Sequence, residues 1–485
     1  MEPTSDIGIV IVGAAGDRGA AALQILPKLR AVEINQGINL DLVCVAEANE
    51  EARAALARKA AALLGASCSV VGLLAEAMPQ ALQWLENGRG ERKLVVYDAT
   101  PTAHHYLHLV SVLPHTAHEH IYYFGEKPLF TKPGQIEFVE RNFPERMFFC
   151  ELIETENPAF RAANEFIRAE GFRIQRMSFW RASCMGVAIA AGDGRRGVEG
   201  GALLDKAPHD LSVAVGLLGP RQVAHWSVSQ VRTHLLALHE SAFQQNTRRF
   251  LSVANEPVDD ISLPARIPEQ APAGGVVSFH VDFMLEGNVA VPASFFGSWL
   301  GVQNTQPELD LSEKLARLGV DTNEWLNTEP SRLSSNPRFG YENQEVRLAL
   351  LEGLLGSRKV HLLLNFLSKF EGRRFVFLLG EDGHRETLFE EKDGPAYHDK
   401  KDADFLGVFQ RVIEHCAGLR AAEYVGREAT LLVHKILMSA LGQANEQLRG
   451  SDQGEAYEAA LVAYRKYLMP VQNARVSRRS GRELP

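Results

Sequence analysis

Apolar, β-branched runs alternate with helix-forming stretches over residues 1–152. The run IGIVIVG at 7–13 contains no polar side chain, which is typical of a strand buried on both faces of a parallel sheet. Alanine-rich or periodic stretches between such runs predict helices. Strands are expected at 7–13, 40–48, 68–72, 93–101 and 146–152, and another ends at the turn 125–128. This alternation predicts a doubly wound parallel sheet, that is, an N-terminal Rossmann domain.

The pattern changes after residue 152. Several segments alternate apolar and polar residues, which is typical of an antiparallel sheet with one covered face. These candidate strands are RIQRMSFWRAS, QVAHWSVSQV, GGVVSFHVDFML, VAVPASFFGSWLG, KVHLLLNFL and RFVFLLG, and a helix is expected at 200–219. We therefore predict an α+β domain with a large, mostly antiparallel sheet at 153–400, insertions at 255–275 and 303–345, and C-terminal helices at 401–485 that pack on both domains.

Composition narrows the class of protein. Of 485 residues, 46% are hydrophobic and 23% charged, which allows a sizeable core in two or three domains. A net charge of −9 without a long basic stretch argues against a nucleic-acid partner. No apolar run reaches the roughly 18 residues of a membrane span, and no secretory signal is evident. Five cysteines without CxxC spacing favour reduced thiols. We expect a soluble, cytoplasmic protein.

The turn GAAGDRG at 13–19 lies between the first predicted strand and a helix. Backbone N–H groups at such a helix start bind a pyrophosphate, and small residues let it approach. The spacing departs from G-x-G-x-x-G, because Ala15 stands where the second glycine is usual. The context still predicts a dinucleotide site. Its turn residues are Gly13, Ala15, Gly16, Asp17 and Arg18.

Glu47 follows the second predicted strand. A carboxylate there can bind the adenosine ribose hydroxyls and repel a 2′-phosphate, which favours NAD. Arg18 in the turn, or Arg53 further along, could instead meet a 2′-phosphate. The cofactor is therefore expected to be NAD or NADP, with NAD favoured.

Two further segments carry candidate chemistry. In the turn Gly125–Pro128, the proline favours an extended Lys127 whose ammonium can reach the carboxyl edge of the sheet. Asp205 and His209 are four residues apart, so on a helix they share one face. Pro208 predicts that the helix starts or is kinked there, which would place the pair near its N-terminus.

An imidazole and an ammonium suit one reaction together. Removing a hydride from an alcohol carbon also requires removing the hydroxyl proton, and imidazole is suited to that at neutral pH. A nearby ammonium stabilises the developing alkoxide. We therefore expect His209 and Lys127 to converge on one oxygen beside a bound nicotinamide.

The GAAGDRG turn, the A-T-P turn at 99–101, GEKP and GG-x-L-x-D-x-x-x-H at 200–209 follow one another in this order. Together they resemble the Gfo/Idh/MocA oxidoreductases over most of residues 7–220, and 282–299 is similar to a substrate-sheet hairpin of that family. The resemblance implies hydride transfer between nicotinamide and a CH–OH or C=O group of a sugar, polyol or sugar derivative.

Carried over by position, His209 would be the general acid/base, Lys127 would polarise the reacting oxygen, and Asp205 would position substrate or tune the pair. Further cofactor contacts would come from Ala99, Thr100, Pro101, His104 and Glu126. Of these, Thr100 and Pro101 would line the nicotinamide site. A homo-oligomer, dimer or tetramer, is expected by analogy.

Some features depart from the family pattern. The segment ELIETEN at 151–157 is acidic where the family often carries an aromatic and an arginine. Lys206 and Pro208 are unusual beside the Asp–His pair. His104 and His108, spaced i and i+4, could ligate a metal, but no further ligand completes a set, so no metal is expected.

Two alternatives remain. The same fold serves NAD(P)-binding regulators without turnover, although retention of Lys127, Asp205 and His209 argues against that reading. It also serves reductases of other substrates, such as an imine or a tetrapyrrole.

Overall fold

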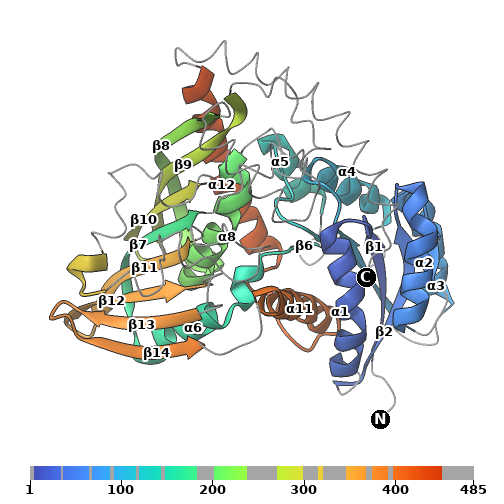
Figure 1. The fold of residues 1–485 in the computed structure, drawn as a ribbon, viewed down its shortest axis with the longest axis horizontal. Helices are drawn as coiled ribbons and strands as arrows, with labels where there is room; N and C mark the ends of the chain where they lie inside the picture. The colour runs from blue at the N-terminus through green and yellow to red at the C-terminus, as the bar shows by residue number, and fades with distance from the viewer. Residues whose placement is uncertain are drawn as a thin grey trace, which may run out of the picture. The chain divides into compact units, whose positions relative to one another are not determined.

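The computed structural model describes residues 5–33, 36–64, 68–87, 92–115, 120–143, 148–182, 201–237, 270–298, 315–320, 346–366, 374–391 and 397–449. These residues form two compact units (Figure 1). Among the described residues, the first unit comprises those within Met1–Ile153 and Lys401–Lys435, and the second those within Glu154–Lys400 and 436–449.

The first unit contains a six-stranded parallel sheet in the order β3-β2-β1-β4-β5-β6. Its strands are β1 (Ser5–Val12), β2 (Ile38–Ala46), β3 (Ser69–Val71), β4 (Arg92–Asp98), β5 (Ile121–Gly125) and β6 (Phe148–Cys150). Its helices are α1 (Asp17–Glu33), α2 (Glu50–Leu64), α3 (Leu74–Glu86), α4 (Thr102–Val112), η2 (Leu113–His115) and α5 (Pro133–Asn142). The predicted Rossmann architecture is confirmed.

The apolar runs predicted to be buried are buried. In β1, the side chains of Ile7, Ile9, Val10 and Ile11 have no exposed surface. This strand pairs in parallel with both β2 and β4, so it lies where the strand order reverses. In doubly wound sheets, ligands bind at the carboxyl ends of the strands at this point.

Two helices from the C-terminal part of the chain follow the sheet strands: α11 (Tyr397–Cys416) and α12 (Arg427–Arg449). Phe409 of α11 packs within the first unit, with its ring 4.8 Å from Tyr97 and 5.0 Å from Phe124. Residues 427–435 of α12 also belong to this unit. The part of the predicted C-terminal helical region beyond residue 449 lies outside the described residues.

The second unit contains an eight-stranded sheet in the order β14-β13-β12-β11-β7-β10-β9-β8. All its pairings are antiparallel except that of β10 with β7, as predicted for a mostly antiparallel sheet. Its strands are β7 (Arg173–Ala182), β8 (Val223–Ala237), β9 (Gln270–Leu285), β10 (Val289–Ser298), β11 (Val346–Leu355), β12 (Arg358–Asn365), β13 (Arg374–Gly380) and β14 (Arg385–Glu391).

Helices pack on this sheet (Figure 1). Those that pack on the sheet are α6 (Pro158–Glu170) and α8 (Gly201–Leu218), and two short 3₁₀ helices, η3 (Ile153–Glu156) and η5 (Pro220–Gln222), accompany them. Helix α8 contacts β7, β9 and β10, whereas α6 contacts β12, β13 and β14. The side chain of Asn157 caps α6 by accepting a hydrogen bond from the backbone N–H of Ala159.

Three sequence expectations need correction. Helix α8 begins at Gly201, so Pro208 lies inside it and does not start it. Strand β9 begins at Gln270, so the end of the insertion predicted at 255–275 is strand. Strands β11 and β14 were not predicted. The remaining parts of both predicted insertions lie outside the described residues, except for 315–320.

In the part of the chain that the structure describes, no helix combines the length and apolar character that a membrane crossing requires.

Candidate active site

Backbone hydrogen bonds between neighbouring strands continue past the carboxyl ends of the parallel strands into the turns that follow them. Backbone hydrogen bonds link Gly13 N to Ala46 O, Ala99 N to Val12 O, Glu126 N to Asp98 O, and Glu151 N to Gly125 O, at 2.8–2.9 Å. The glycine turn, the A-T-P turn and the GEKP turn therefore follow adjacent strands at one edge. This places most of the predicted cofactor residues, and Lys127, on a common side of the first unit.

The glycine turn is closely packed. Gly13 has a φ of +80°, and a Cβ there would lie 2.9 Å from Cγ2 of Thr100. A Cβ at Gly19 would lie 2.4 Å from the carbonyl oxygen of Gly13. Helix α1 begins at Asp17, whose side chain is outside the described residues. The turn thus has the small residues and the helix start that a pyrophosphate needs.

Glu47 lies beside this turn. Its two carboxylate oxygens accept hydrogen bonds from the backbone N–H groups of Ala15 and Asn49, both at 2.8 Å. Arg53 donates to the Glu47 carbonyl at 2.8 Å. A carboxylate has about four acceptor positions, so Glu47 retains the capacity to bind a ribose hydroxyl.

Arg18 has different partners. Its Nε lies 3.5 Å from a Glu151 oxygen and 3.7 Å from a Glu126 oxygen, and its guanidinium stacks over the ring of Phe405 at 5.5 Å. Glu151 also accepts a hydrogen bond from the Tyr97 hydroxyl at 2.8 Å. Two carboxylates already balance the Arg18 charge, which weakens the case that Arg18 binds a 2′-phosphate.

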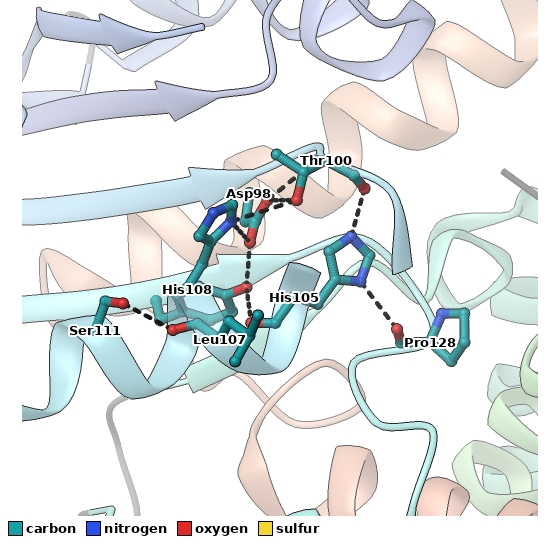
Figure 2. A network of polar contacts seen from close by, with 8 residues as sticks. Asp98, Thr100, His105, Leu107, His108, Ser111 and Pro128 are labelled. Carbon is teal, nitrogen blue, oxygen red and sulfur yellow. Dashed lines mark hydrogen bonds and ion pairs between the residues drawn. The ribbon is translucent and has the colours of Figure 1, made fainter. Parts of the chain in front are cut away.

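Asp98, at the end of β4, centres a polar network (Figure 2). It accepts hydrogen bonds from the backbone N–H and hydroxyl of Thr100, at 3.0 and 2.6 Å, from the Tyr123 hydroxyl at 2.7 Å, and from His108 Nδ1 at 2.9 Å. Burial opposes ionisation, but the bond from His108 and the charge of His105 outweigh it, so the pKa of Asp98 is well below its usual value. The carboxylate fixes the A-T-P turn.

The other predicted residues of this edge are partly accessible. Ala99 is 8% exposed, Pro101 and His104 are exposed, and Glu126 and Lys127 are half-buried. The His104 ring stacks on that of His108 at 6.0 Å. The Lys127–Pro128 peptide bond is cis. An accessible edge of this kind leaves Lys127 able to meet a ligand.

In the second unit, helix α8 presents Asp205 and His209. All other residues of the helix are buried, whereas the side chains of these two are 15% and 12% exposed. The spacing of four residues therefore puts both on one face, as expected. Lys206, which the sequence singled out as unusual, forms an ion pair with Asp205 at 3.0 Å.

Glu154 is a site residue that sequence reasoning missed. One of its oxygens lies 3.8 Å from His209 Nδ1, and the same oxygen accepts a hydrogen bond from Arg181 at 2.8 Å. Arg181 also binds Asp210, at 2.8 Å. Burial opposes ionisation of Glu154, but Arg181 and Arg347 outweigh it and lower its pKa. An ionised carboxylate therefore stands beside the candidate acid/base.

No protein-family model matches the chain, and no curated protein sequence matches it. Solved structures do match. An NAD-binding oxidoreductase from Klebsiella pneumoniae has a TM-score of 0.56 at 14% identity, covering 91% of this chain and 98% of its own. An inositol dehydrogenase homologue from Azotobacter vinelandii, complexed with NADH and myo-inositol, has a TM-score of 0.54 at 12% identity, over 92% and 98%. A levoglucosan dehydrogenase complexed with NADH and levoglucosan has a TM-score of 0.52 at 13% identity, over 91% and 98%.

The chain has the two-domain fold of the Gfo/Idh/MocA oxidoreductases. The parallel sheet and the mostly antiparallel sheet account for this likeness. The predicted cofactor residues and Lys127 belong to the first unit, and Asp205 and His209 to the second. That Lys127 and His209 meet at one oxygen stays a prediction.

Proposed function

We propose that this protein is an NAD(P)-dependent oxidoreductase that transfers a hydride between the nicotinamide and a CH–OH or C=O group of a sugar or polyol. The observation that carries the proposal is the accessible Asp205–His209 pair on an otherwise buried helix. The fold is shared with structures that hold NADH together with myo-inositol or levoglucosan, which supports the substrate class.

The residues at the parallel-sheet edge fit a dinucleotide. The 13–19 turn would hold the pyrophosphate, Glu47 the adenosine ribose, and the A-T-P turn the nicotinamide. When bound, the nicotinamide supplies the hydride acceptor or donor. The Glu47 carboxylate would repel a 2′-phosphate, so we expect NAD to bind more tightly than NADP.

The chain's own groups would handle the proton. His209 would take the hydroxyl proton during oxidation and return it during reduction, while the nearby Glu154 carboxylate stabilises the protonated ring. The Lys127 ammonium would stabilise the developing alkoxide, as positioned positive charge does for an oxyanion. Asp205 would orient the substrate hydroxyls.

Turnover with a panel of sugars and polyols, with NAD or NADP, tests the proposal through the absorbance of the reduced nicotinamide. We expect activity with at least one polyol and a preference for NAD. Tight dinucleotide binding without turnover of any substrate would instead favour a regulator.

The His209→Ala variant tests the assigned role. General acid/base groups contribute about 100- to 10,000-fold, so kcat should fall by that factor while cofactor affinity changes little. His225, an exposed histidine of β8, provides the matched control: His225→Ala should retain full activity. A large loss of cofactor binding in His209→Ala would contradict the assignment.

A further inference from the structure

Two histidines hold neighbouring backbone groups of the turn that carries Lys127. His105 of α4 contacts the carbonyl oxygen of Pro128, and His434 of α12 contacts the N–H of Leu129. Both histidines are buried, with 1% and 0% of their surface exposed. The peptide group between Pro128 and Leu129 is thus held at its carbonyl and at its N–H by side chains from helices far apart in the sequence.

The bond from Leu129 defines the state of His434. The Leu129 N–H donates to His434 Nε2 at 2.9 Å, so this nitrogen carries no proton. Nδ1 then donates to the carbonyl oxygen of Thr430 at 2.7 Å. Burial lowers the pKa of His434 to about 4, so the ring is neutral near pH 7. The Phe130 ring lies edge-on to it at 5.1 Å.

His105 joins two turns of the candidate site (Figure 2). Its Nδ1 lies 2.9 Å from the Pro128 oxygen, and its Nε2 lies 2.6 Å from the Thr100 oxygen. A carbonyl can only accept, so the ring donates to one of them in either neutral form and to both when doubly protonated. Asp98, at the end of β4, fixes Thr100 by hydrogen bonds. Because His105 contacts both Thr100 and Pro128, it links the position of Pro128 to the end of β4.

We propose that His105 and His434 are positioning residues for Lys127. The inference rests on the proposed function, because it gives Lys127 a reacting oxygen to meet. Lys127 is joined directly to Pro128, so a displacement of Pro128 or Leu129 moves its backbone. A misplacement of about 1 Å can lower a rate about 100-fold.

Acylation of lysines, followed by mass spectrometry, reports on Lys127 without requiring turnover. The rate at Lys127 is divided by the rate at Lys132, an exposed lysine close in sequence, so that differences in reagent concentration cancel. Labelling is done under conditions in which circular dichroism shows each variant to be fully folded, because unfolding would also raise the ratio. Loss of one hydrogen bond should raise this ratio about three- to tenfold. A ratio that stays at the wild-type value, or falls, in the variants below would overturn the proposal.

Paired variants separate the hydrogen bond from general packing. His434→Leu removes the acceptor for Leu129, whereas the Oε1 of His434→Gln can replace Nε2. His105→Leu removes both ring nitrogens and with them every hydrogen bond of the side chain, whereas His105→Asn keeps a donor near the Nδ1 position. We expect the raised ratio in both leucine variants and near-wild-type ratios in His434→Gln and His105→Asn. Equal ratios within each pair would overturn the proposal.

Kinetics supply the functional readout. In the leucine variants kcat should fall about 10- to 100-fold, with the KM for the dinucleotide nearly unchanged. His434→Gln and His105→Asn should recover most of the loss. Unchanged kcat in the leucine variants would overturn the positioning role. If the wild-type protein turns over no substrate, the proposed function fails, and the acylation ratios still decide whether the histidines position Lys127.

Discussion

Glu154 lies between two arginines that face each other across neighbouring strands. Arg347 of β11 is directly opposite Arg181 of β7, and like charges in this arrangement destabilise a sheet. The same Glu154 oxygen is 2.8 Å from Arg181 and 3.7 Å from Arg347. Its negative charge therefore stabilises the register of two central strands and, 3.8 Å from His209, the candidate site as well.

We expect Glu154→Gln to lower the free energy of unfolding by about 3 kcal/mol, because it leaves buried positive charge uncompensated. Urea unfolding measures the change. Glu165→Gln replaces an exposed glutamate of the neighbouring α6 and should change stability by less than about 0.5 kcal/mol. Equal stabilities for the two variants would show that the arginines do not depend on Glu154.

Single residues with long-range partners could not be predicted from the sequence. The acidic segment at 151–157 was noticed only as a departure from a family pattern. Its contact with His209 joins residues that no local spacing relates. His434 lies in one of the C-terminal helices that the sequence predicts, but the local sequence gives no indication of the Leu129 amide that it binds.

At the scale of elements, the glycine turn depends on close backbone approach. A Cβ at Gly19 would lie 2.4 Å from the Gly13 oxygen and 2.5 Å from the Ala14 Cα, and both are backbone atoms that cannot move alone. The first turn of α1 can therefore pack this closely against the end of β1 only because residue 19 has no side chain.

Gly19→Ala should weaken dinucleotide binding about 5- to 150-fold, since a backbone strain of about 1–3 kcal/mol must be relieved by opening the turn. Titration of NADH fluorescence measures the affinity. Gly134→Ala in α5 is the control, because a Cβ there meets no atom within 4 Å. Equal affinities for the two variants would show that the turn does not contact the cofactor.

Elements with strong local patterns were predicted well. The apolar run of β1 is short, rich in β-branched residues and followed by a glycine turn, and the stretch of α8 is too long for an ordinary strand, so both types were predicted correctly. The segment VRLALLEGLL of β11 is apolar without strict alternation, which fits a helix as well as a buried strand. In β14, charged residues dominate, as is common for an edge strand, so its sequence lacks the alternating apolar pattern that predicts a strand.

At the scale of the whole molecule, the first unit is built from two distant parts of the chain, because residues Lys401–Lys435 belong to it together with Met1–Ile153. Helix α11 brings Glu414 close to Glu33 at the end of α1. Both are buried, and Glu414 accepts hydrogen bonds from Gln36, at 3.2 Å, and Gln410, at 2.8 Å. Burial, together with the charge of Glu414, raises the pKa of Glu33 to about 7.

This shift makes stability depend on pH. The unfolded chain releases the Glu33 proton near pH 4.5, whereas the folded chain keeps it to about pH 7. The contribution of Glu33 to stability is therefore greatest below the lower value and decreases as the pH rises through this window. Glu33→Gln should remove most of the decrease and stabilise the protein by about 2 kcal/mol at pH 8. Thermal unfolding at pH 5 and pH 8 measures both effects, and identical pH profiles for variant and wild type would contradict them.

The placement of Phe409 and His434 has a consequence for biosynthesis. Translation delivers β1 to β6 first, yet Tyr97 and Phe124 gain the Phe409 ring, and Leu129 its acceptor, only when residues beyond 400 have left the ribosome. Until then the nascent sheet exposes apolar surface of the kind that chaperones bind. The parallel-sheet unit of the molecule is thus among the first parts to be synthesised and among the last to be completed.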